Sequence, residues 1–288
     1  MKLHNQLIAF CMVCANIGGS AAFVIQTPKT LSPSTSALSA KPDFEIFPTF
    51  DDLDYVEAGN TIRTYPMPAW ATRVQMRFET NGRPLKGEAN LWLGPIRKTH
   101  TLKFDTESGV EFPIEALLKF KVGPPVLKIS TADNLNYPMQ VGVFVPPPER
   151  AAELDAYTEK MFDSSSKEDK KRIQGSNTDG KYGAAVNWVI PHNVDSVQII
   201  GWSKDTGKKS FKLDLELLQG PNNVKQSLFL QCGGGSQPYH AVFKTPGSGW
   251  TVRIRNKKYV EDGLVEVAVL PYEKTAKDTG KRAMNNWS

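Results

Sequence analysis

A segment that occurs twice constrains the fold of this chain more than any other feature. The stretches "ANLWLGPIRKTHTLKF" (89–104) and "LELLQGPNNVKQSLFL" (215–230) each place an apolar run before a Gly-Pro pair, with apolar residues seven and nine positions after the proline. Proline lacks the N–H that a β-ladder needs, so it marks where a strand ends. The polar residues after the proline differ between the two copies. The segment therefore indicates a repeated strand–turn–strand rather than a catalytic site, with its turns at Gly94, Pro95, Gly220 and Pro221.

Other pairs recur in the same order in the two halves of the chain. A Val-Gln pair stands six residues after a proline at Val74 and again at Val197, and a Phe-Lys pair occurs at Phe120 and at Phe243. Each half also closes on alternating valines followed by a proline. Single strand patterns imitate one another, but several matches in one order with similar gaps are typical of duplication. The sequence therefore predicts a tandem repeat.

The repeat unit has the pattern of a β-domain. Alternation such as that in "TRVQMRFET" predicts half-buried strands, and 20 prolines with 22 glycines favour many turns. A unit of about ninety residues with about six to eight short strands suits an antiparallel β-sandwich. We therefore expect an all-β fold of two tandem antiparallel β-sandwich-like repeats. The expected boundaries are an N-terminal arm at 43–61, β-domain 1 at 62–147, a short helix (Glu149–Phe162) and linker within 148–183, β-domain 2 at 184–272 and an extended C-terminal arm at 273–288.

The first 42 residues have the composition of a targeting leader. A basic residue, Lys2, precedes an apolar core and small residues, which predicts a signal peptide over 1–22. Residues 23–42 are rich in Ser, Thr and Pro and contain no acidic residue, which predicts a plastid transit peptide. With Phe23 at the junction, the leader is similar to the bipartite plastid-targeting leaders of diatoms and related algae. The alternative is plain secretion with a disordered pro-segment.

The apparent basicity of the chain belongs largely to this leader. The formal net charge is +5, but residues 1–42 hold three lysines and no acidic residue, so the remainder has 32 basic and 30 acidic residues, or +2. This balance gives no reason to expect a nucleic-acid or anionic-lipid partner. Cys11 and Cys14 also fall in the leader. Cys232 alone cannot form an intrachain disulfide, which favours a reducing compartment such as the plastid stroma.

The residues that could carry chemistry form no recognisable constellation. His100, His192 and His240 lack a second His or Cys at a zinc-ligand spacing. Cys232 precedes "GGGS", with His240 eight residues on, but a Cys–His nucleophile needs an activated thiol and an oriented base. "GGGS" also lacks the Gly-Lys-Ser/Thr ending of a phosphate loop. We expect no catalytic residue, no metal and no cofactor.

Aromatic residues are the remaining candidates for function. Trp92 is opposite in phase to its two leucine neighbours, which predicts that it faces outward. Aromatic residues also occur in both terminal arms, where they dock either on their own domain or on a neighbouring molecule. Aromatic side chains are common anchors of protein contacts. The candidate self-assembly contacts are Phe44, Phe47, Phe50, Trp92, Trp202 and Trp287.

The layout as a whole resembles a known family. The leader around "SAAFV", the tandem β-domains, the segments "LWLGP" and "LLQGP" and the tail "NNWS" are similar to those of the pyrenoid shell (PyShell) proteins of diatoms. The resemblance implies a structural protein of the plastid stroma, at the pyrenoid periphery, that self-associates into a sheet around the Rubisco matrix and supports CO2 concentration and fixation. It implies further copies of the chain, paralogous shell subunits and the Rubisco matrix as partners, with no nucleic acid and no membrane insertion of the mature protein.

Two other functions fit the residues. A plastid carbohydrate-binding or scaffold module would use Trp92 or Trp202 as a stacking platform for a sugar ring. An enzyme would be built on Cys232 and His240. Assembly of the protein in the absence of any ligand would distinguish a shell subunit from both.

Overall fold

The computed structural model describes Pro42 and residues 44–47, 53–121, 123, 125–132, 137–175, 184–203, 210–233, 238–258 and 264–274. All of them belong to one compact unit that spans 36–288. The expected signal peptide and, apart from Pro42, the expected transit peptide lie outside the described residues, as do Phe50 and Trp287. Because the compact unit contains every described strand, we expect it to fold without the leader.

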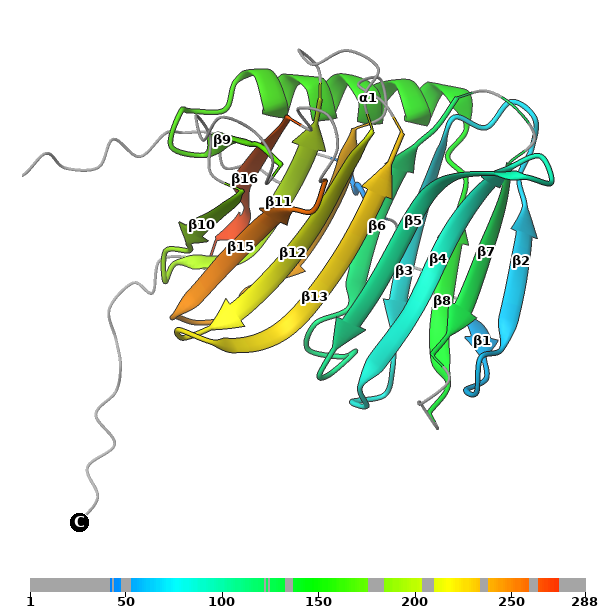
Figure 1. Cartoon of the computed structure of the whole chain (residues 1–288), viewed down its shortest axis with the longest axis horizontal. Helices are drawn as coiled ribbons and strands as arrows, with labels where there is room; N and C mark the ends of the chain where they lie inside the picture. Colours follow the sequence, from blue (N-terminus) through cyan, green and yellow to red (C-terminus); the bar gives the residue numbers. More distant parts are fainter. Residues whose placement is uncertain are drawn as a thin grey trace, which may run out of the picture. The chain divides into compact units, whose positions relative to one another are not determined.

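The described residues form two antiparallel eight-stranded sheets and one helix (Figure 1). The strands of sheet A are, in spatial order, β1 (Asp54–Val56), β8 (Met139–Phe144), β3 (Arg73–Glu79), β6 (Ile114–Lys119), β14 (Tyr239–Lys244), β11 (Val194–Trp202), β16 (Val265–Lys274) and β9 (Lys170–Ile173). The strands of sheet B are β10 (Ala185–Val189), β15 (Trp250–Asn256), β12 (Phe211–Gln219), β13 (Asn223–Cys232), β5 (Arg97–Thr106), β4 (Leu85–Leu93), β7 (Pro125–Thr131) and β2 (Ile62–Pro66). The helix, α1, covers Pro148–Asp163.

Each half of the chain supplies four neighbouring strands to each sheet. From edge to centre, sheet A takes β1, β8, β3 and β6 from the first half and β9, β16, β11 and β14 from the second. Sheet B takes β2, β7, β4 and β5 from the first half and β10, β15, β12 and β13 from the second. The all-β antiparallel prediction is therefore confirmed. The expected domain boundaries, however, fall within two continuous sheets and do not separate two sandwiches.

The segment that occurs twice lies at the centre of sheet B. Its copies form the β4–β5 and β12–β13 hairpins, whose turns contain Gly94 and Gly220 with φ of 69° and 74°. Glycine occupies this left-handed region without the steric cost that a side chain brings. β5 and β13 pair antiparallel, with Leu102 opposite Leu230. The two copies of the segment therefore join the two halves of the sheet.

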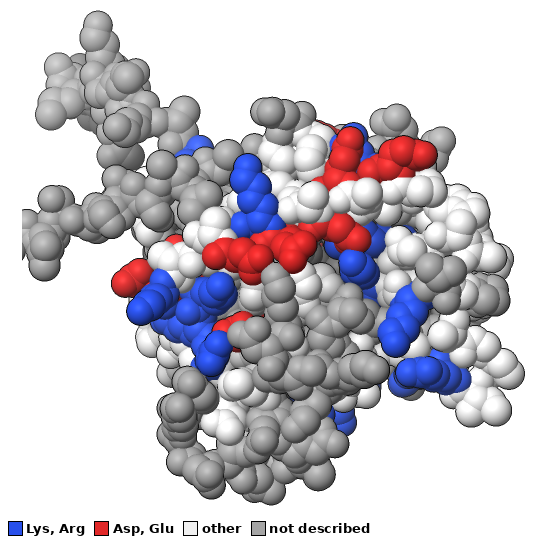
Figure 2. Space-filling model, turned by 90° about the horizontal axis from the view of Figure 1, so that it is seen from above, with Lys and Arg blue, Asp and Glu red and all other residues white. Residues whose placement is uncertain are grey.

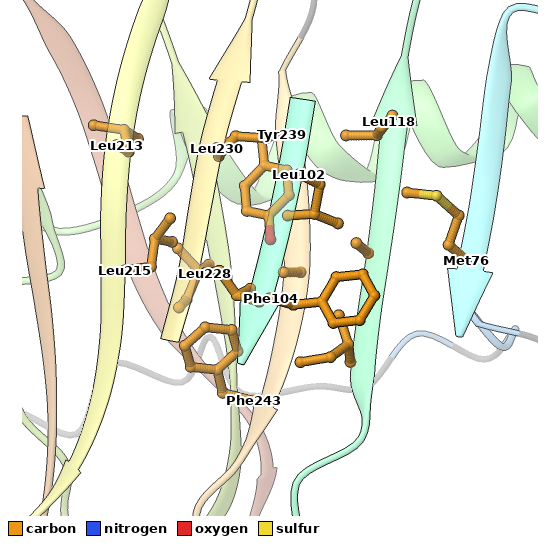
Figure 3. Packing of buried hydrophobic residues seen from close by; sticks show 14 of the residues in the cluster. Met76, Leu102, Phe104, Leu118, Leu213, Leu215, Leu228, Leu230, Tyr239 and Phe243 are labelled. Atoms are coloured by element: carbon orange, nitrogen blue, oxygen red, sulfur yellow. The ribbon is translucent and has the colours of Figure 1, made fainter. Parts of the chain in front are cut away.

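The alternating apolar residues of these strands fill the space between the sheets, as Figure 3 shows for Leu102, Leu228 and Leu230. The ring of Phe104 stacks on that of Phe78 of sheet A, with 4.5 Å between centroids. The core is continuous across both halves, because it includes buried residues of all four central strands. Burial of this apolar area is the main term that stabilises the fold.

One anchor of the expected repeat was misaligned. In sheet A, Val74 stands opposite Leu118, and its counterpart Val197 stands opposite Phe243. Phe243 therefore holds the place of Leu118, whereas Phe120 follows the end of β6. A shift of two residues keeps every side chain on the same face of a strand, so the sequence pattern did not reveal the error.

Helix α1 covers the outer face of sheet A. Its buried residues Leu154, Met161 and Phe162 pack on residues of β6, β14, β11 and β16, so one helix crosses strands from both halves. Proline in the first turn fits the helix start, because its missing N–H would have no intrahelical partner there. No helix in the described part of the chain is long and apolar enough to cross a lipid bilayer.

Three expected boundaries differ from the structure. The expected N-terminal arm at 43–61 contains β1, which pairs with β8 at the edge of sheet A. The expected linker contains β9, whose sequence "KKRI" lacks an apolar alternation and which pairs with β16 at the edge of sheet A. The expected C-terminal arm began at 273, but β16 continues to Lys274, and Glu273 stands opposite Ser196 of β11. These differences arise because pairing to a neighbouring strand, which is non-local in sequence, extends the ladder into polar segments.

Candidate functional site

The aromatic residues of the N-terminal arm dock on their own domain. The ring of Phe44 makes an edge contact with Tyr157 of α1, with centroids 5.8 Å apart, and the guanidinium of Arg150 lies 4.8 Å from the Phe44 centroid. Phe47 is buried, and its ring lies 6.3 Å from the imidazole of His240. Phe44 and Phe47, which we expected as contacts between molecules, thus fasten the arm beside α1.

His240 lies at the centre of the contact between α1 and sheet A. Its Nε2 is 3.1 Å from Oε1 of Gln198, which also accepts a hydrogen bond from the hydroxyl of Tyr157. The Tyr157 and His240 rings stack with an interplanar angle of 11°. Burial, together with the nearby charge of Arg73, lowers the pKa of His240 to about 3. The imidazole is therefore a neutral, packed group at physiological pH.

Cys232 and His240 do not form a catalytic pair. The Cys232 side chain belongs to the core between the sheets, where burial raises the pKa of its thiol. Along β14, Tyr239 points into that core, so His240 points to the opposite face of sheet A. The thiol lacks the electropositive, accessible setting that a nucleophile needs. This geometry overturns the hypothesis of an enzyme built on these two residues.

His100 is also a packed residue. It is buried on β5, its Nδ1 lies 3.0 Å from Oγ1 of Thr99, and burial lowers its pKa to about 4. In the residues that the structure describes, no group of three or more His, Cys, Asp or Glu side chains is placed to hold a metal ion.

The two candidate tryptophans occupy different settings. Trp202 ends β11, is half-buried and packs on Phe162 of α1 with ring centroids 5.3 Å apart. Trp92 faces outward from sheet B, as expected, beside Val126 and Lys98 on the neighbouring strands. It is half-buried, and a bulge between Leu91 and Trp92 shifts the strand register at this point.

The outer face of sheet B is a broad, charged strand surface. Cross-strand ion pairs join Lys86 to Asp105 at 3.0 Å and Lys103 to Glu88 at 3.5 Å in the first half. In the second half, Lys257 lies 3.2 Å from Asp214 and Arg253 lies 2.5 Å from Glu216. A hollow of about 470 Å³ lies over the first group of ion pairs and extends to β13, lined in part by Lys86, Glu88, Lys103, Asp105, Ser227 and Phe229.

Charges of both signs lie side by side on the outer face of sheet B. Figure 2, which views the molecule from above, shows basic side chains beside acidic ones rather than a single patch of one sign. This distribution does not resemble the basic stripe that binds nucleic acid.

Phe229, an aromatic residue that lines the hollow, was not among our candidates. Its position between the buried Leu228 and Leu230 was a usable signal, because alternation predicts that it faces outward.

Four strands form the open ends of the sheets. β1 and β2 lie at the first-half end, and β9 and β10 lie at the second-half end. Two large aliphatic side chains on these strands are exposed: 49% of Ile62 on β2 and 80% of Val189 on β10. Neither residue stood out in the sequence, since short strands at a sheet edge carry too few residues for a clear alternation.

These features define the class of protein: an antiparallel β protein of two sheets, distinguished by the charged outer face of sheet B and by the open edge strands of both sheets. The family model described as "Diatom pyrenoid shell protein" matches residues 52–271. The chain therefore belongs to the diatom pyrenoid shell protein family, and the resemblance seen in the sequence is confirmed.

The other comparisons add little. No curated protein matches the chain. Among solved structures, a mutant of the oxalate decarboxylase OxdC from Bacillus subtilis is 10% identical, with 79% of this chain and 77% of that chain covered and a TM-score of 0.14. Similarity at that level carries no argument about fold or catalysis.

Proposed function

We propose that this protein is a non-enzymatic, self-assembling subunit of a sheet-like shell that surrounds the Rubisco matrix of the pyrenoid. Membership of the pyrenoid shell family supports a structural role in the pyrenoid. The single structural observation that supports assembly best is the pair of continuous eight-stranded sheets, which ends in edge strands on both sides. A subunit with two different ends of this kind suits heterologous contacts, which extend without closing into a ring.

The proposal includes an internal duplication. The strands of the two halves occupy corresponding places in both sheets, and the β4–β5 and β12–β13 hairpins carry bulges at corresponding positions, before Trp92 and before Leu218. A duplicated unit has an edge strand of each sheet in the corresponding place at both of its ends, which lets the sheets of successive copies meet in a repeating layer.

The proposed setting is the plastid stroma at the pyrenoid periphery, with the shell limiting CO2 leakage. Its partners would be further copies of this chain, paralogous shell subunits and the Rubisco matrix. Cys232 of β13 is buried between the two sheets, whereas His240 of β14 is buried on the other side of sheet A, under α1. This supports a non-enzymatic role, because the one nucleophile–base pair suggested by the sequence is not assembled.

Concentration-dependent assembly without a ligand tests this function. The compact unit 36–288 should scatter light above a threshold concentration and form extended sheets in negative-stain electron microscopy. A fluorescent fusion of the full chain should outline the pyrenoid rim in a diatom cell. A unit that stays monomeric at all soluble concentrations, together with a fusion spread through the stroma, would contradict the proposal.

A further inference from the structure

The edge strands of sheet B have backbone groups that point away from the sheet. On β2, the carbonyl of Thr61 and the N–H of Met67 bond to β7, so the odd-numbered residues face β7 and the groups of Ile62 and Thr64 face the free edge. On β10, the carbonyl of Ala184 and the N–H of Ile190 bond to β15. The even-numbered residues of β10 therefore face β15.

The backbone groups of Asn187 and Val189 consequently face the free edge of β10. Among the described residues, no strand pairs with β2 or β10 on that side. Lys171 donates to the carbonyl oxygen of Asn187 at 3.2 Å, which leaves the second lone pair of that oxygen free to accept.

Each of these free edges exposes one large aliphatic side chain, Ile62 on β2 and Val189 on β10. The register places Ile62 beside Ser130 and Val189 beside Thr251, both on the outer face of sheet B. Natural edges are usually protected by lysines, prolines or bulges. Pro66 at the end of β2 is such a device, but Ile62 and Thr64 precede it and keep their N–H groups.

The strand count fixes how two such edges can meet. Every neighbouring pair in each sheet is antiparallel, and each sheet has eight strands, so β2 and β10 run in opposite directions, as do β1 and β9. A second copy placed one further step along sheet B would therefore bring its β10 antiparallel to β2. The same step brings its β9 antiparallel to β1.

We propose that copies of this chain join head to tail through their sheet edges, with β2 of one copy pairing with β10 of the next. This inference rests on the proposed self-assembly and names its contact. Thr64 stands opposite Asn187 of the next copy, which places Ile62 opposite Val189 on the same face. The pairing completes backbone hydrogen bonds and buries two exposed apolar side chains, as in strand addition between other proteins.

Charges at the edges of sheet A favour this arrangement over a two-fold one. The segment 53–57, which contains β1, carries Asp54 and Glu57 and no basic residue. β9 carries Lys170, Lys171 and Arg172. The two lysines donate to main-chain carbonyl oxygens, of Phe162 and Asn187, so those contacts leave their charges in place, while Arg172 pairs with Glu266 at 2.6 Å.

Head-to-tail contact therefore brings an acidic edge to a basic one. Contact of β1 with β1, or of β9 with β9, brings like charges together, which costs free energy. The complementary charges of the two edges thus favour a row in which all copies point in the same direction and which does not close on itself.

A charge exchange tests the register. In the compact unit 36–288, Ile62→Lys or Val189→Glu alone should raise the threshold concentration for assembly by about tenfold or more, because each replaces one apolar partner of the cross-strand contact with an unpaired charge. The double variant Ile62→Lys/Val189→Glu places the two charges opposite each other and should return the threshold to within about threefold of wild type. Ile96→Lys is the matched control, since Ile96 is 88% exposed in the β4–β5 turn, and it should assemble normally.

A second measurement needs no substitution. Amide hydrogen exchange of the wild-type unit should show β2 and β10 protected in assemblies relative to dispersed protein, with the β4–β5 turn unchanged. Circular dichroism of the dispersed variants checks that each is folded.

The outcomes separate this inference from the proposed function. Wild-type sheets whose β2 and β10 amides stay unprotected, or single variants that assemble normally, would overturn the edge pairing and leave a shell subunit that uses other contacts. Single variants that fail without rescue in the double variant would indicate a two-fold contact and overturn the head-to-tail register. A wild-type unit that never assembles would overturn both proposals.

Discussion

Lys103 and Phe229 stand directly opposite each other where β5 meets β13, and each is the eighth residue after the proline of its Gly-Pro pair. Positions equally distant from this pair also face each other: Leu102 faces Leu230, and Phe104 faces Leu228. The two halves of sheet B are thus related about this one cross-strand pair. The halves share one core there, so they should not unfold separately.

Leu230→Ala tests the shared core. Leu230 is fully buried, and its truncation should lower the free energy of unfolding by about 2–5 kcal/mol. Because both halves pack on it, urea unfolding should remain a single transition that coincides by far-UV circular dichroism and tryptophan fluorescence. Ile96→Ala, in an exposed turn, should change stability little. Two separated transitions, with only one displaced by Leu230→Ala, would show instead that the halves are independent domains.

Gly87→Ala tests the tightest approach in sheet B. A Cβ atom at Gly87 would lie 2.8 Å from the ring of Phe104 and 2.8 Å from the carbonyl oxygen of Ser130. We expect a loss of about 1–3 kcal/mol, because backbone must move to relieve the overlap. The matched control is Gly201→Ala on β11, where the nearest atom would be 3.5 Å away. Thermal unfolding of both variants decides the point, and equal melting temperatures would count against the close approach.

Asp155 of α1 holds two basic groups of sheet A. It pairs with the buried guanidinium of Arg73 and lies 2.7 Å from Nζ of Lys119. Asp155→Asn should destabilise the protein by about 1–3 kcal/mol, less than for a fully buried pair because the carboxylate is one-third exposed. Glu153→Gln, which removes an exposed partner of Arg150 on the same helix, is the control. If the urea midpoints shifted equally in both variants, the ion pairs of Asp155 with Arg73 and Lys119 would contribute no more to stability than an exposed pair.

Acid should weaken the folded state through its buried histidines. Burial lowers the pKa of His240 to about 3 and that of His100 to about 4, whereas an unfolded chain has a histidine pKa of about 6.5. Protons therefore bind more tightly to the unfolded state. Above about pH 6.5 the two histidines should not reduce the free energy of unfolding. As the pH drops further, each histidine should lower the free energy of unfolding by up to about 1.4 kcal/mol per pH unit, until the pH reaches its pKa in the folded state.

His240→Gln isolates this effect. The variant should show a shallower loss of stability between about pH 6.5 and 4.5 in urea titrations, even if it is less stable at neutral pH. His192→Gln, in an exposed turn before β11, should retain the wild-type slope. A slope that is the same in all three proteins would show that His240 does not carry the acid sensitivity.

Removal of residues 275–288 tests the C-terminal arm. Because β16 ends at Lys274, this deletion leaves every described contact in place and should yield a folded unit with impaired assembly. A deletion that begins at 272 also removes Tyr272, which is buried beside α1, and should lower the melting temperature. Unaltered sheets from the shorter deletion, judged by negative-stain microscopy, would exclude the arm as an assembly contact.

The sequence predicted local features well. The Gly-Pro pairs marked hairpin turns, the alternation around Val74 marked a buried strand, and the helix was placed to within one residue at each end. Each of these depends on residues close together in the chain. The outward direction of Trp92 was also correct, because it follows from strand periodicity alone.

The features that the sequence missed depend on partners distant in the chain. Pairing of β5 with β13 joins residues more than a hundred positions apart, and no periodicity specifies it. The same reason explains β9, a basic segment that becomes a strand because β16 lies beside it. Trp202 could be predicted as a strand residue, but its packing against Phe162 of α1 could not.

Helix α1 breaks the correspondence between the two halves. Both sheets are built from matching sets of strands, yet the one helix in the described part of the chain lies across sheet A, and none of the described elements covers the ion-paired outer face of sheet B. A row of copies joined edge to edge would turn all its helices to the same side. Such a row would have an inside and an outside with different chemistry, so that one surface could adhere to an enclosed phase while the other repelled it.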